Sequence, residues 1–138
     1  MRTTSWMILW LLPMGLAYGQ DSLDYKKRQR MVIIGSATTY GASMVGLHAL
    51  WYSQFDRQSF RFFDDAAEWK QMDKIGHFYS AYQVTAISAS TWRWAGMEQR
   101  KAARLSSLIS FGILSSIEVL DGFSSGYGAS ASDWVANA

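Results

Sequence analysis

The sequence predicts an all-α fold, a small bundle of three to four helices that are rich in small residues. Hydrophobic residues make up 49% of the 138 residues and charged residues only 17%, below the usual share in a soluble domain. Three mostly apolar stretches of helical length are separated by charged, aromatic or Gly-rich segments. We therefore expect one helical domain, with at least one helix that is a candidate for embedding in a membrane.

The chain opens with a segment typical of a secretory signal peptide. Arg2 precedes an apolar run of about twelve residues, and the small residues Ala17 and Gly19 fit the positions before a signal peptidase cut. This predicts a signal peptide over residues 1–19 and a helical envelope domain over 20–138. The alternative is a short uncleaved anchor, although so short an apolar run cannot cross a bilayer as a helix.

The first predicted helix covers residues 31–52 and follows a polar lead-in over residues 21–30. The helix carries no formal charge and is about long enough to span a bilayer. Ala42 and Gly46 form a small-xxx-small pair that allows another helix to approach closely. Small residues also pack well inside soluble bundles, so a membrane-embedded helix and a buried soluble helix both remain open.

Residues 53–72 form an aromatic connection that contains four phenylalanines, Trp69 and both signs of charge. Such a composition is typical of an aromatic belt at a membrane interface. It is equally typical of an amphipathic loop that packs its aromatic rings on the domain.

The second helix is predicted over residues 73–95, with Gly96 as its stop. A basic surface segment over residues 97–104 then leads into the third helix, residues 105–121. The serines of this third helix suit a surface that faces other helices better than one that faces lipid.

The last predicted element is a short helix that follows a Gly/Ser-rich segment. Residues 122–132 are predicted to form a turn or a re-entrant loop. Ser130 lies three residues before Asp133, a spacing that resembles a capping box and predicts a short fourth helix over residues 133–138. A helix this short is stable only when it docks on other helices or continues further.

The charge pattern limits both the partners and the topology. The formal net charge is only +2, so we expect no nucleic-acid partner. If the leader is cleaved, the basic clusters at 26–30 and 100–104 both lie outside the inner membrane, against the positive-inside preference. A periplasmic bundle, or one attached to the outer membrane, is not subject to that rule.

Polar residues spaced to share one helix face stand at the ends of three different predicted helices. These pairs are Asp73 with His77, Glu118 with Asp121, and Asp133 with Asn137. If the helix ends converge, we expect one polar pocket in surroundings of low dielectric constant. Each pair also has a local explanation, because acids are favoured in a first helical turn and at caps.

Carboxylates beside an imidazole suit a divalent cation, or a carboxylic acid kept protonated for acid catalysis. The candidate metal ligands are Asp73, His77, Glu118, Asp121 and Asp133. The candidate catalytic residues are His77, Asp73 and Asp121, and Lys74 and Asn137 complete the polar group. No HExxH, GxSxG or P-loop motif is present, and the lack of cysteine excludes a thiolate site in these residues.

The segments WKQMDKIGHFYSAYQ and IEVLDGFSSGYGASASDWVAN resemble the YfiM-like predicted periplasmic lipoproteins, and ALWYSQFDRQSFRFFDDAAEW is similar to longer variants of that family. The resemblance covers residues 48–138, and a weaker one extends to VanZ-like membrane proteins. It implies an exported helical envelope protein, with no established activity, whose shared polar positions are Asp73, Lys74, His77, Glu118, Asp121, Asp133 and Asn137. Members carry a lipid-accepting cysteine that this sequence lacks, and they continue past the position of Asn137.

Three functions follow as hypotheses. The first is a membrane-associated envelope protein, anchored by residues 31–52, whose polar cluster specifies the bundle or binds an ion or a lipid head group. The second is a metal-assisted hydrolase or transferase acting on lipid or cell-wall phosphate, with His77 as acid or base. The third is an accessory subunit that docks on an envelope protein complex.

Overall fold

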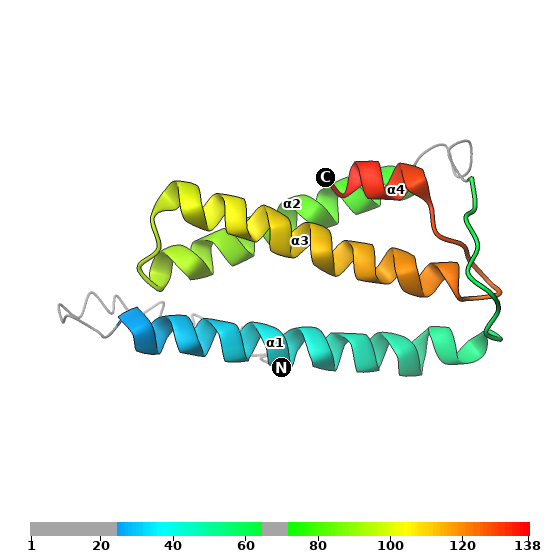
Figure 1. Cartoon of the computed structure of the whole chain (residues 1–138), viewed down its shortest axis with the longest axis horizontal. Helices are drawn as coiled ribbons and strands as arrows, with labels where there is room; N and C mark the ends of the chain where they lie inside the picture. Colours follow the sequence, from blue (N-terminus) through cyan, green and yellow to red (C-terminus); the bar gives the residue numbers. More distant parts are fainter. Residues whose placement is uncertain (1–24, 65–71) are drawn as a thin grey trace, which may run out of the picture.

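The computed structural model describes residues 25–64 and 72–138, which form four α-helices and one short 3₁₀ helix (Figure 1). The elements are α1 (Tyr25–Leu50), η1 (Tyr52–Gln54), α2 (Met72–Trp94), α3 (Gln99–Gly122) and α4 (Ala131–Ala136). Within these two ranges the chain forms isolated β-bridges but no strand, and the predicted all-α class is confirmed. The predicted signal peptide and Trp69 lie outside the described residues.

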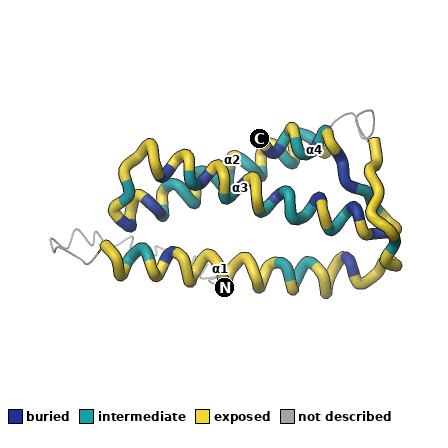
Figure 2. Tube along the Cα trace, in the orientation of Figure 1, coloured by how far each residue is buried: buried dark blue, intermediate teal, exposed yellow. Residues whose placement is uncertain are grey.

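Helix α1 begins earlier than predicted. Residues 25–30, expected as part of a solvated lead-in, form its first turns. Lysine, arginine and glutamine are good helix formers, so a charged segment can continue a helix without contributing to a core. Most of α1 is exposed (Figure 2), and its Val32 packs into a small apolar cluster with Trp92, Ala95 and Ala102.

The connection between α2 and α3 forms where the sequence predicts a helix stop. Gly96 adopts a φ of 86°, a left-handed conformation that glycine enters without strain. A Cβ atom there would lie 2.2 Å from the ring of Tyr25, so the glycine also makes room for α1. The tight turn makes α2 and α3 antiparallel (Figure 1).

Helix α3 starts at Gln99, so most of the basic segment predicted to precede the helix belongs to it. Its buried face carries Ser106 and Ser110, and Ser110 Oγ donates a hydrogen bond of 3.0 Å to the carbonyl oxygen of Ala81 in α2. Small side chains allow the two backbones to approach closely. The expectation that the serines of α3 face other helices is therefore confirmed for Ser106 and Ser110, whereas Ser107 is exposed.

The structure also changes which helix is the candidate for crossing a membrane. In the described part of the chain, α3 is the one helix that is long and apolar enough to cross a bilayer, by length and composition alone. The sequence pattern had favoured residues 31–52 for this role. The glycines, serines and threonines of α1 keep its hydropathy lower.

The described part of the aromatic connection, residues 53–64, packs on the loop that follows α3. Arg61 and Phe63 exchange backbone hydrogen bonds with Gly122 and Ala129. The ring of Phe60 lies 5.2 Å from that of Phe123, in an edge-to-face arrangement. These contacts favour the reading of an amphipathic loop that packs its rings on the domain.

The loop carries the chain to α4, which docks on α2 and α3 (Figure 1). Ser130 is the N-cap of α4, and its Oγ accepts a hydrogen bond from the backbone N–H of Asp133 at 3.2 Å. The predicted capping interaction and the docked short helix are both confirmed, with the helix starting at Ala131.

Candidate metal centre

The three helix ends predicted to converge do so in the structure. Because α3 runs antiparallel to α2, its last turn lies beside the first turns of α2, and α4 packs across both. Asp73 and His77 come from α2, Glu118 from α3, and Asp133 from α4. The sequence places each residue on its helix, and the tertiary packing brings them together.

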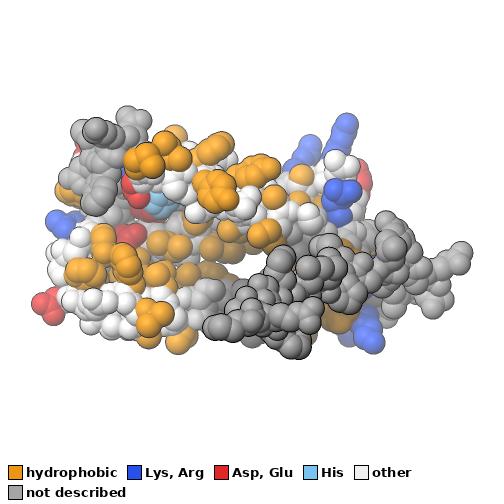
Figure 3. Space-filling view, turned by 180° about the vertical axis from the view of Figure 1, so that it is seen from behind, with side chains coloured by type: hydrophobic (Ala, Val, Ile, Leu, Met, Phe, Trp, Pro, Cys, Tyr) orange, Lys and Arg blue, Asp and Glu red, His pale blue; other side chains and the backbone are white. Residues whose placement is uncertain are grey.

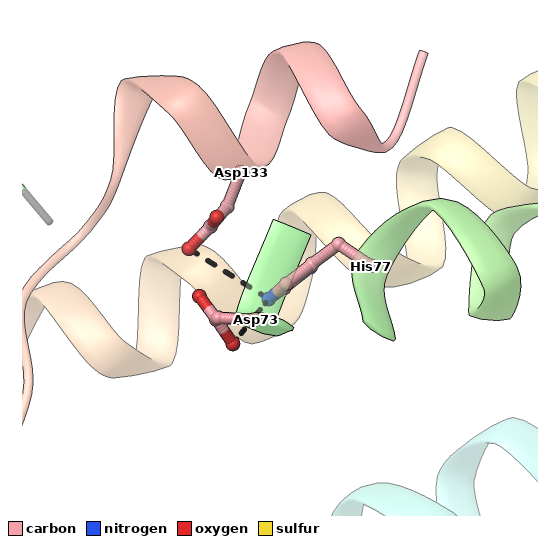
Figure 4. A group of neighbouring side chains, drawn as sticks. All are labelled: Asp73, His77 and Asp133. Carbon is pink, nitrogen blue, oxygen red and sulfur yellow. Dashed lines mark ion pairs between the residues drawn. The ribbon is translucent and has the colours of Figure 1, made fainter. Parts of the chain in front are cut away.

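His77 lies at the centre of the cluster (Figure 4). Its Nε2 atom is 3.7 Å from Oδ1 of Asp73 and 3.7 Å from Oδ2 of Asp133. One potential ligand atom from each of these three residues lies within 4.8 Å of the others. Asp133 is buried and Asp73 is the exposed member, so the group opens on one side.

Among the described residues, Lys74 supplies the one ammonium group within the cluster. Its Nζ lies 2.6 Å from Oδ1 of Asp133 and 3.2 Å from Oδ2 of Asp73. Lys74 therefore bridges the two carboxylates through the oxygen of each that is not the one paired with His77 Nε2. A buried carboxylate such as that of Asp133 needs such a partner, since desolvation disfavours its charged form.

Glu118 is 1% exposed, and its two oxygens have different surroundings. Oε2 accepts a hydrogen bond of 3.1 Å from the backbone N–H of Ser130, which ties α3 to the N-cap of α4. Oε1 has no hydrogen-bond partner and lies 3.5 Å from Nε2 of His77. Burial raises the pKa of Glu118 to about 7, and the negative charge of Asp133 adds to that effect.

Asp121 occupies a neighbouring position with a different partner. The hydroxyl of Tyr52 donates a hydrogen bond of 2.6 Å to Oδ1 of Asp121. Burial raises the pKa of Asp121, while this hydrogen bond acts in the opposite direction. Burial and the Asp121 charge also raise the pKa of Tyr52. Asp121, predicted as a ligand, is not among the three residues whose ligand atoms lie together.

Asn137, the C-cap of α4, orients the imidazole. Its Oδ1 lies 3.0 Å from Nδ1 of His77. Because an amide oxygen can only accept, Nδ1 carries the proton, and in the neutral ring Nε2 presents a lone pair to the carboxylates. Histidine ligands of metals are commonly oriented by such a hydrogen bond from the second ring nitrogen.

A pocket of about 700 Å³ opens on this cluster. Asp73, His77, Glu118, Asp121 and Asp133 all line it. Its remaining wall is largely apolar and aromatic, and the lining residues there include Leu47, Trp51, Tyr52, Phe63, Met72, Ile117 and Tyr127. The pocket lining therefore combines acidic groups and the cation of Arg61 with an apolar, aromatic wall.

Sequence reasoning did not identify three residues that shape the pocket. Tyr52 holds Asp121, and Arg61 donates hydrogen bonds of 3.0 and 2.6 Å from its Nε and Nη2 to the carbonyl oxygen of Tyr127. Arg61 and Tyr127 come from the aromatic connection and the Gly/Ser-rich loop, where no helical periodicity indicates which side chains point inward. Tyr52 is the last residue of the first predicted helix and lies in η1 in the structure. The sequence did contain a signal for Arg61, because it is a charged residue within an aromatic segment.

Glu118 gives the apo protein a pH-dependent stability. Its pKa is higher in the folded than in the unfolded chain, so its stabilising contribution is present at pH 4 and is lost as the pH rises through about 7. We expect Glu118→Gln, measured by chemical denaturation in a chelator, to remove up to about 3 kcal/mol of the fall in unfolding free energy between pH 5 and pH 8. An unchanged pH profile in this variant would contradict the assignment, and Glu98→Gln, at an exposed position, is the control.

A family of proteins described as predicted periplasmic lipoproteins (DUF2279) matches residues 61–138, more than half of the chain and all of the polar cluster. No curated protein and no solved structure matches the chain. The family match confirms the predicted resemblance and the expected export to the periplasm. The chain thus belongs to the DUF2279 family of predicted periplasmic lipoproteins.

Proposed function

We propose that this protein is a membrane-associated envelope protein that binds a divalent transition-metal ion through Asp73, His77 and Asp133. The observation that carries the proposal is the placement of these three ligand atoms, within 4.8 Å of one another, at the floor of a pocket. An imidazole with carboxylates is a ligand set that suits Zn²⁺, Mn²⁺ or Fe²⁺.

The distances support a metal of this kind. In a tetrahedral site with bonds of 2.0–2.1 Å, neighbouring ligand atoms lie about 3.3–3.4 Å apart. The distances from His77 Nε2 to the oxygens of Asp73 and Asp133 are both 3.7 Å. These two distances exceed the tetrahedral spacing by a few tenths of an ångström, and the oxygens of Asp73 and Asp133, which lie within 4.8 Å of each other, would move closer together around one ion.

Glu118 provides independent support for a cation at this position. Its side chain is almost completely buried, and Oε1 has no hydrogen-bond partner while it faces Nε2 of His77. A buried carboxylate oxygen in that state is costly unless it meets a positive charge. It would serve as a fourth ligand, or would accept a hydrogen bond from a metal-bound water.

The charge balance points the same way. Four carboxylates line the pocket floor, and Lys74 brings one positive charge next to two of them. Arg61 also lines the pocket, and Glu118, with a pKa of about 7, carries only part of a charge at neutral pH. With His77 neutral, the described groups still keep a small excess of negative charge. A divalent cation would reduce that excess in a site where water screens it poorly.

The direct test is a metal titration of the purified protein, by calorimetry and by metal analysis after dialysis. We expect one ion of Zn²⁺ or Mn²⁺ per chain, and at least a 100-fold weaker affinity in His77→Gln. His48→Gln is the matched control, since His48 is the other histidine and lies exposed on α1. Absence of binding in the wild type, or equal binding in both variants, would refute the proposal.

Membrane association is supported by large apolar side chains that lie exposed on the helices. In α1 these include Ile33, Ile34 and Val45, and in α2 they include Phe78 and Tyr82. Exposed apolar surface on this scale is typical of a contact with lipid or with a partner protein. If the contact is with a protein, we expect the partner to be an envelope protein complex in which this chain is an accessory subunit.

The pocket favours a second candidate function, a metal-assisted hydrolase or transferase acting on lipid or cell-wall phosphate. Three protein ligands beside an open cavity leave room for a water or a substrate oxygen on the ion. The apolar wall around Trp51 and Tyr127 would suit the non-polar part of such a substrate. Metal-dependent cleavage of a chromogenic phosphate ester, lost in His77→Gln, would support this role, whereas tight metal binding without turnover would leave the accessory role.

A further inference from the structure

One end of the bundle carries most of the positive charge of the described residues. This basic end consists of the first turns of α1, the last turn of α2 and the first turns of α3 (Figure 3). It holds eight of the eleven lysines and arginines in the described ranges: Lys26, Lys27, Arg28, Arg30, Arg93, Arg100, Lys101 and Arg104. The acidic cluster lies at the opposite end.

Local helix stability does not account for this placement. The N-terminal end of a helix carries a partial positive charge, so acidic residues are favoured there and basic residues are unfavourable. The first turns of α1 and α3 contain no acidic residue and several basic ones. The eight cations and the N-termini of α1 and α3 outweigh the partial negative charge at the C-terminus of α2, so this end has a net positive field, as expected of a surface that meets an anionic partner.

In the described part of the chain, one acidic residue lies at the basic end. This residue is Glu98, and its Oε2 lies 3.7 Å from Nζ of Lys101. Both of these side chains are largely exposed, so this contact is screened by water. Among the described residues, the basic end therefore keeps a net positive charge.

Aromatic side chains accompany the cations. Tyr25 and Trp94 are both more than half exposed at this end. Arg28 donates a hydrogen bond of 3.0 Å to the carbonyl oxygen of Trp94, and its guanidinium lies 4.9 Å from the centre of the indole ring. Tryptophan and tyrosine beside arginine and lysine are the combination that favours the head-group region of a bilayer.

We propose that the basic end is a docking surface for a bilayer of anionic phospholipid, with the cations on head-group phosphates and Tyr25 and Trp94 at the interface. The 26 residues of α1 then place the metal pocket about 39 Å from the contact, at the far end of the bundle. The inference is independent of the metal site, because no residue of the cluster takes part in it.

The test is flotation of the full chain with vesicles of phosphatidylglycerol and phosphatidylcholine, compared with vesicles of phosphatidylcholine alone. We expect binding to the anionic vesicles to exceed binding to the neutral ones at low salt and to weaken steeply as salt is added. The combined variant Arg100→Gln, Lys101→Gln, Arg104→Gln should lower the partition coefficient by about 100-fold. All three side chains are exposed, so the fold should persist, as circular dichroism would verify.

A matched control changes the net charge by the same amount at the other end. Arg57→Gln with Ser59→Glu and Ser125→Glu alters three exposed positions there, and should lower the partition coefficient by less than tenfold. Equal effects of the two triple variants, or binding to neutral vesicles as strong as to anionic ones, would overturn the proposal. So would an absence of flotation with either vesicle, which would assign the basic end to an anionic partner other than a bilayer.

Discussion

Ser110→Leu is expected to lower the free energy of unfolding by about 3 kcal/mol or more. Ser110 is 1% exposed between α2 and α3, and its hydroxyl donates to the carbonyl oxygen of Ala81. Leucine would lose that hydrogen bond and would force apart two helices that small residues hold close together. Chemical denaturation followed by circular dichroism measures the change.

Ser107→Leu is the control for this prediction. Ser107 lies on the exposed face of the same helix, and its hydroxyl bonds within α3 to the carbonyl oxygen of Ala103 at 3.1 Å. An exposed substitution of this kind is expected to change stability by no more than about 0.5 kcal/mol. Similar losses in the two variants would mean that the serine face does not form the α2–α3 contact.

Metal binding is expected to stabilise the protein by about 4 kcal/mol when the free ion is 1,000-fold above its dissociation constant, because the unfolded chain lacks the assembled ligands. Asp73→Asn should remove most of this gain. Asp73 is nearly half exposed, and Lys74 keeps its 2.6 Å contact with Asp133, so the apo form of the variant should unfold at nearly the wild-type denaturant concentration. Denaturation with and without chelator separates the stability of the apo protein from the stabilisation that the metal adds.

Two results would contradict this second prediction. One is a wild-type protein whose unfolding midpoint does not respond to Zn²⁺ or Mn²⁺. The other is an equal response in Asp73→Asn, which would place the ion on other groups. Asp56→Asn is a suitable control, since Asp56 is exposed and is not among the three proposed ligands.

The helices were predictable because their signals are local. The apolar run from Asp73 onwards, the stop at Gly96 and the cap at Ser130 each depend on residues within one or two turns. The same reasoning failed at the starts of α1 and α3. Their first turns are rich in lysine, arginine and glutamine, which favour a helix without an apolar pattern to mark its beginning.

The candidate site was predictable only in part. Helical spacing places His77 on the same face as Asp73, and Asn137 on the same face as Asp133, without any knowledge of the fold. Spacing cannot reveal which residue of another element each will meet. Asp121 faces Tyr52, at the end of the first predicted helix, and Glu118 faces His77, and neither pairing follows from spacing.

By itself, the sequence determined the helical class and the residue types that could hold a cation, and it predicted a signal peptide, because composition and short-range spacing encode these properties. The tertiary structure decided that the polar helix ends share one pocket and that the cations of α1, α2 and α3 gather at the opposite end. The physical reason is the antiparallel packing of α2 on the serine face of α3, which depends on contacts between residues far apart in the chain.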